Sequence, residues 1–124
     1  MKSYTNIEQS KKLVGILSPE SADMFYDGIR NIDTNKYYIP HDSHPKVGKG
    51  YEGECPTNCV GTLFLPCWSL AALLEQFEDT AGLAKDYGLW FCYDNRKSYC
   101  TKHYDNPIDA CVETIIKLNE QKLL

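Results

Sequence analysis

The chain has 124 residues, of which 43% are hydrophobic and 24% are charged, and its formal net charge is −4. This length and composition are typical of a globular domain with a hydrophobic core, and they exclude a disordered or fibrous chain. No cluster of Lys and Arg is present in the sequence, so an acidic chain of this kind is not expected to bind nucleic acid phosphates.

The N-terminal residues contain no apolar stretch like that of a secretory signal, and no later run approaches the length of a membrane span. We therefore expect a cytoplasmic protein that has no membrane contact. In a reducing compartment, cysteines are predicted to be thiols or metal ligands rather than disulfides. The six cysteines are Cys55, Cys59, Cys67, Cys92, Cys100 and Cys111.

The first part of the chain predicts two helices and a strand. Thr5-Asn6-Ile7-Glu8 has the pattern of a capping box and predicts a helix through about Leu17. Ser18 followed by Pro19 predicts a second helix start, and this short helix is expected to close before Gly28. Residues 36–39 are aromatic and β-branched, which favours a strand that ends at Pro40.

The most apolar segment of the sequence surrounds the clearest helix start. Ser69 is a good N-cap, and apolar residues at the spacing of one helical stripe follow it as far as Phe77. Trp68 precedes the cap and is expected to pack against the helix as part of the core. Residues 60–65 are predicted to form a strand that leads into this helix.

The C-terminal part predicts a connection, a hairpin and a helix. Residues 78–88 are polar and are expected to connect two elements. Residues 89–93 and 98–104 are predicted to form an antiparallel hairpin about a turn at 95–97. Asn106 and Pro107 begin the last helix, whose predicted buried stripe is Ile108, Cys111, Val112, Ile115 and Leu118.

The order of these elements predicts an α+β fold, because the regular spacing of repeated βαβ units is absent. We expect one compact domain over residues 1–124. Its core would be a small antiparallel sheet with a C-terminal hairpin, packed by about four helices.

Residues 41–59 are predicted to form a long loop, since Gly and Pro recur through them and long loops are often functional. His41, His44, Cys55 and Cys59 have the spacing of zinc ligands within this loop. Two interpretations stay open, a zinc site and a loop without metal whose cysteines only pack. We expect no cofactor in the second case, and a protein partner is then expected to bind the loop.

The same loop contains a match to the dinucleotide fingerprint G-x-G-x-x-G. The fingerprint functions only where a strand leads into the glycines and a helix begins at them. Pro45 precedes the match and Pro56 follows it, so we interpret the glycines as turn residues. The match is Gly48-Lys49-Gly50-Tyr51-Glu52-Gly53.

No set of residues predicts catalysis. Cys100 and His103 would point to opposite faces of a regular strand, so they do not predict a nucleophile and its base. Cys92 and Cys100 are equally distant from Arg96 and are expected to face each other across the hairpin as thiols. The nine tyrosines, several of them in predicted strands, are the alternative contact surface to the loop.

Three segments carry a resemblance to known sequences. These are the opening residues 7–24, the segment from Pro66 to Glu75 with the Tyr93-Asp94 hairpin, and the segment from Asn106 to Ile116. The chain resembles a group of small uncharacterised proteins from phages and prophages of gut bacteria. This resemblance implies a cytoplasmic accessory protein of a mobile element, and it assigns no catalytic residue.

The sequence therefore favours a non-enzymatic protein-interaction module. The alternative is a small zinc protein or an enzyme whose site lies under residues 41–59.

Overall fold

The structure, a computed structural model, describes residues 3–30, 32–34, 36–48, 64–77, 81–94, 99–100 and 102–121. These residues form helices and small antiparallel sheets, which confirms the α+β class. The chain divides into two compact units, Asn6–Trp68 and Ser69–Leu124 with Met1–Thr5. The expectation of one domain over residues 1–124 stays a prediction.

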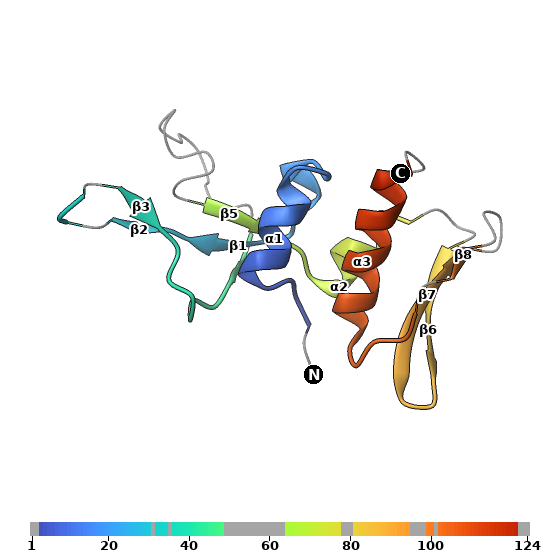
Figure 1. Ribbon diagram of the computed structural model, residues 1–124. Helices are drawn as coiled ribbons and strands as arrows, with labels where there is room; N and C mark the ends of the chain where they lie inside the picture. The colour runs from blue at the N-terminus through green and yellow to red at the C-terminus, as the bar shows by residue number, and fades with distance from the viewer. Residues whose placement is uncertain are drawn as a thin grey trace. The chain divides into compact units, whose positions relative to one another are not determined.

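The Asn6–Trp68 unit is built on a three-stranded antiparallel sheet, and a helix packs against one of its edge strands (Figure 1). The strand order is β4, β1, β5, so that strands distant in sequence lie side by side. A separate two-stranded sheet follows β1. The elements are α1 (Ile7–Val14), β1 (Met24–Asp27), β2 (Ile29–Arg30), β3 (Tyr37–Tyr38), β4 (Lys46–Val47) and β5 (Phe64–Cys67).

Helix α1 begins one residue later than predicted. Asn6 is its N-cap, since the Asn6 side chain accepts a hydrogen bond of 2.8 Å from the backbone N–H of Gln9. The Gln9 side chain accepts one of 3.1 Å from the backbone N–H of Asn6. These two bonds satisfy backbone donors at the helix start that have no partner within the helix.

The second predicted helix is wrong. Ser18 and Pro19 start only a single 3-10 turn, η1 (Pro19–Ser21), and β1 begins at Met24. Phe25 and Tyr26 favour a strand, and pairing with both β4 and β5 satisfies the β1 backbone better than one further helical turn. Within the described residues there are thus three α-helices and one 3-10 helix.

The Ser69–Leu124 unit is organised around α3 (Pro107–Glu120), which contacts α2 (Leu70–Leu74) and a three-stranded antiparallel sheet (Figure 1). The start of α3 is confirmed, because the Asn106 side chain accepts a hydrogen bond of 2.9 Å from the Asp109 backbone. All five residues of its predicted stripe are buried. Helix α2 begins after Ser69 as predicted but ends at Leu74.

The sheet of this unit contains a strand that was not predicted. Residues 78–88 were expected to be a connection, yet they contain β6 (Ala81–Asp86), which pairs with β7 (Leu89–Asp94). On its other side β7 pairs with β8 (Tyr99–Cys100) through Tyr93 and Asp94, and Trp90 forms an isolated bridge with Tyr104. The hairpin of residues 89–93 and 98–104 stays a prediction. The residues of β6 are mostly small and have low β-propensity, so the sequence did not predict a strand there. Pairing with β7 outweighs this weak local preference.

None of the described helices is long and apolar enough to cross a membrane.

Trp68 is the largest fully buried side chain that the structure describes. Its indole Nε1 donates a hydrogen bond of 2.9 Å to Oγ of Ser21. The bond joins the end of β5 to the turn that precedes β1, and it satisfies the one polar group of the indole ring. The predicted burial of Trp68 is confirmed, whereas its packing against the helix after Ser69 stays a prediction.

We expect Trp68→Ala to lower the free energy of unfolding by about 3–5 kcal/mol, because it removes a fully buried ring. Ser21→Ala, the matched control, keeps the ring but removes the hydroxyl that accepts from the indole and donates a hydrogen bond of 2.6 Å to the Ser18 carbonyl. It should cost about 1–3 kcal/mol. Urea unfolding followed by circular dichroism measures both. A loss below about 1 kcal/mol for Trp68→Ala would contradict the assignment of this ring to the core.

Candidate functional site

The sheet of the Ser69–Leu124 unit has one face on α3 and one face away from it. Cys92 lies against Cys111 of α3, and side chains alternate between the two faces of a strand. Leu89, Phe91 and Tyr93 of β7 therefore point away from α3 and stay partly exposed. We call these three residues, together with His103, the outer face.

His103 lies on the outer face because the segment that pairs with β7 has one residue more than β7 between two paired positions. Tyr93 pairs with Cys100 but Trp90 pairs with Tyr104, so the segment opposite β7 has one residue more. The regular alternation that separated Cys100 from His103 in the sequence prediction does not hold across such an offset. The His103 ring instead lies 4.8 Å from the Phe91 ring, centroid to centroid.

Gly82 of β6 makes room for the aromatic side chain opposite it. Gly82 pairs with Tyr93 across the strands. A Cβ atom at position 82 would lie 2.6 Å from the Tyr93 hydroxyl oxygen, so the phenol ring occupies the place of the missing side chain. The Phe91 and Tyr93 rings are 6.4 Å apart, and together they form a continuous aromatic strip along β7.

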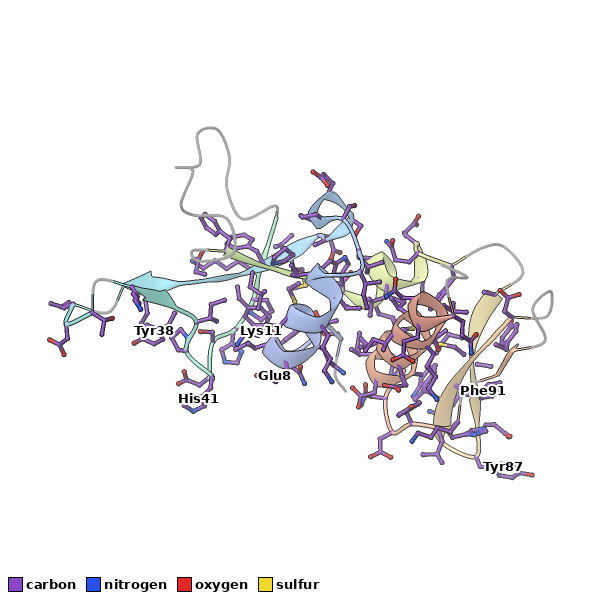
Figure 2. All side chains as sticks on the ribbon, turned by 45° about the horizontal axis from the view of Figure 1, so that its top comes forward. Glu8, Lys11, Tyr38, His41, Tyr87 and Phe91 are labelled. Carbon is purple, nitrogen blue, oxygen red and sulfur yellow. The ribbon has the colours of Figure 1, made fainter. Side chains whose placement is uncertain are left out.

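The turn that joins β6 and β7 carries an aromatic residue in a strained conformation. Tyr87 has φ 52° and Gly88 has φ 80°, as in the type I′ turns of two-residue hairpins. Among the described residues, Tyr87 is the one non-glycine residue with positive φ. Figure 2 shows its side chain at the tip of the hairpin, where it is 97% exposed.

This conformation costs Tyr87 free energy that a glycine would avoid and that an asparagine would reduce, because its short polar side chain can hydrogen-bond locally. A residue with a Cβ in the left-handed region loses about 1–2 kcal/mol. Asn-Gly is the common choice for this turn, and the Tyr-Gly pair gives no such local signal for a hairpin. The residues of β6, Ala-Gly-Leu-Ala-Lys-Asp, do not alternate between apolar and polar, so the sequence offered no periodic signal for this strand.

Among the residues that the structure describes near the outer face, His103 and Asp86 are the polar pair that comes closest. His103 Nε2 lies 3.9 Å from Oδ2 of Asp86, and both side chains are exposed to water. An exposed pair at this distance has a small effect on stability. No group of three or more metal-ligating side chains gathers within the described parts of the chain.

The predicted zinc ligands are placed only in part. His41 and His44 are exposed in the connection between β3 and β4, where Figure 2 labels His41. Cys55 and Cys59 lie outside the described residues, so the zinc site stays a prediction. The predicted loop 41–59 is wrong at Lys46 and Val47, which form β4.

Gly48, the first glycine of the fingerprint match, has a structural role. It follows β4 with φ 126°, and its backbone N–H donates a hydrogen bond of 2.9 Å to the Asp23 carbonyl. A residue with a side chain would be strained in this conformation. The rest of the fingerprint match, residues 49–53, lies outside the described residues.

A second feature lies on the buried face of the same sheet. Sγ of Cys92 lies 3.8 Å from Sγ of Cys111, and both residues are buried. Hydrogen bonding with Cys111 lowers the pKa of Cys92 against the effect of burial, and Thr114 lowers it further. The pKa of Cys111 is raised, first by the hydrogen bond with Cys92 and then by burial.

The predicted pairing of Cys92 with Cys100 is wrong. Cys100 stands opposite Tyr93, and Cys92 stands opposite Leu83 of β6. The prediction assumed a hairpin centred on Arg96, and the observed register differs from that by one residue. A shift of one residue moves a side chain to the other face of the sheet. The cysteine near Cys92 comes from α3.

Comparison of this chain with protein-family models, with curated protein sequences and with solved structures finds no match.

We expect Tyr87→Asn to raise the free energy of unfolding by about 0.5–1 kcal/mol, because asparagine tolerates positive φ. Ile32→Asn is the matched control, since Ile32 is 88% exposed in a turn and has no positive φ. It should change stability by less than about 0.5 kcal/mol. Urea unfolding measures both, and destabilisation by Tyr87→Asn would show that the tyrosine ring makes a contact worth more than the strain.

Proposed function

We propose that the protein is a non-enzymatic interaction module that binds a protein partner through the tip and outer face of the β6–β7 hairpin. The observation that carries the proposal is Tyr87, a fully exposed aromatic residue held in a conformation that destabilises the chain. Backbone strain of this kind at an exposed position is common where a residue serves binding.

The residues around Tyr87 support a partner protein whose contact surface is apolar and carries little charge. Leu89 and Phe91 continue from the turn along the outer face, and Tyr93 extends the strip further. Tyrosine and other aromatic residues contribute large contact areas at low entropic cost, and they are enriched at binding hot spots. Of the charged groups that the structure describes, Asp86 and His103 form an ion pair beside the strip, with opposite charges when His103 is protonated.

The proposal also includes four expectations that come from the sequence. They are an accessory role in a phage or prophage, a cytoplasmic location, one domain over 1–124 packed by about four helices, and no nucleic acid or membrane partner. The resemblance supports the first two, and the acidic composition supports the exclusion of nucleic acid. Residues 41–59 remain the second candidate surface for the partner.

We expect Tyr87→Asn to weaken partner binding by about 2 kcal/mol, or roughly 30-fold in affinity, as for a central hot-spot residue. The test introduces a photo-crosslinking amino acid at position 87 and, as the matched control, at the similarly exposed position 32. Both proteins are incubated with a lysate of gut bacteria, irradiated, and the crosslinked proteins are identified by mass spectrometry.

The expected result is a protein that crosslinks from position 87 but not from position 32, and whose affinity falls in the Tyr87→Asn variant. The Ile32→Asn variant should bind it with unchanged affinity. Equal affinity of both variants for the captured protein would contradict a contact at the hairpin tip.

The alternative, a zinc protein, is favoured by the spacing of His41, His44, Cys55 and Cys59. We expect protein purified without a histidine tag and without added metal to hold less than about one tenth of a zinc ion per chain. Elemental analysis by plasma mass spectrometry measures this content. About one zinc per chain that disappears in Cys55→Ser but persists in Cys100→Ser would establish the alternative instead.

A further inference from the structure

The buried face of the β6–β7–β8 sheet holds a pair of thiols for which the proposed binding function has no use. Cys92 lies on the middle strand and Cys111 lies on the second turn of α3. Their sulfur atoms are 3.8 Å apart. Two cysteines that belong to different elements and meet in one core form a possible cross-link between those elements.

We propose that Cys92 and Cys111 are a redox-active pair, which hydrogen peroxide converts to a disulfide that joins β7 to α3. A disulfide bond has a sulfur–sulfur distance of about 2.0 Å, so the two atoms must approach by about 1.8 Å. Rotation of two side chains about χ1 is the simplest movement that supplies such a shift. No rearrangement of β7 or α3 as a whole is required for it.

The surroundings give the two thiols different roles. The two sulfur atoms share a hydrogen bond, which lowers the pKa of Cys92 and favours its thiolate. The thiolate is the nucleophile towards a peroxide. Cys111, with a raised pKa, keeps its proton until the second step. Cys92 is therefore the residue that reacts first, and Cys111 is the one that resolves the product.

The reaction balances in two steps. Ionised Sγ of Cys92 attacks one oxygen of hydrogen peroxide, the O–O bond breaks, and hydroxide leaves a sulfenic acid on Cys92. Sγ of Cys111 then attacks that sulfur, the S–S bond forms, the S–O bond breaks, and the proton of Cys111 completes a water molecule. The two thiols lose two electrons and two protons in total, and the peroxide becomes two waters.

Burial of both sulfurs sets the conditions of the reaction. The exposed fractions are 1% for Cys92 and 0% for Cys111, so the peroxide reaches them only during local opening. Oxidation is then slow, and the product remains protected from reduction by large thiol proteins. The disulfide closes a loop between residues 19 positions apart, which should stabilise this unit.

Trypsin separates the relevant cysteines, which makes the pairing directly measurable. Cleavage after Lys85, Arg96, Lys97, Lys102 and Lys117 places Cys92 in peptide 86–96, Cys100 in 98–102 and Cys111 in 103–117. The reduced, full-length protein is treated with hydrogen peroxide, and remaining thiols are alkylated in denaturant. Digestion without reductant and mass spectrometry then identify the linked peptides.

We expect peptides 86–96 and 103–117 to appear as one disulfide-linked species that dithiothreitol separates. The same treatment in 8 M urea should give a mixture of pairings, because proximity is lost. Oxidation under native conditions should also raise the urea midpoint of the protein. Recovery of both peptides in alkylated form, or a native pairing no more selective than that in urea, would overturn the proposal.

Two variants test the roles of the cysteines. In Cys111→Ala, a dimedone probe should label a sulfenic acid on Cys92, whereas Cys92→Ala should leave Cys111 unlabelled. Cys100→Ser is the matched control and should form the linked species at the rate of the unmodified protein. If a core variant fails to fold, the comparison of native and urea-treated protein decides the proposal by itself.

Discussion

The burial of α3 is the constraint on which the Ser69–Leu124 unit depends. Its residues Ile108, Ala110, Cys111, Val112, Thr114, Ile115 and Leu118 are all buried, so the helix must be covered along several rows. Helix α2 and the sheet supply this cover within the unit. The apolar area that is removed from water stabilises each of the three elements, since a five-residue helix and a short hairpin are marginal by themselves.

The packing of α3 against one face of the sheet also defines the other face. Once Cys92 is placed on the helix side, strand alternation leaves Phe91 and Tyr93 partly exposed. Selection for stability alone would favour polar residues at these exposed positions and an asparagine at position 87. Aromatic residues on the outer face and at the strained turn are therefore best explained by a use outside the fold.

The two proposals place separate chemistry on the two faces of one sheet. The outer face offers rings and few charges, which suits contact with another protein. The buried face holds two sulfurs whose surroundings distinguish the first reacting thiol from the second. A cross-link from β7 to α3 would act on the same strand that carries Phe91, so the binding surface would become more rigid on oxidation.

The sequence by itself determined the starts of α2 and α3 and the buried stripe of α3. Ser69 and Asn106 each accept a hydrogen bond from the backbone N–H three residues further on, and such local contacts do not need the rest of the fold. Apolar spacing likewise identified the core side of α3, because it reflects the helical period alone.

Only the tertiary structure decided which segments became strands and how they pair. The helix expected after Pro19 became β1, and the connection expected before Gly88 became β6, because neighbouring strands satisfied the backbone of each. Pairing between strands also explains why Cys92 lies against Cys111 and not opposite Cys100, and why His103 lies on the outer face. Register and bulges set which side chains meet, and they depend on pairing between distant segments that no local pattern encodes.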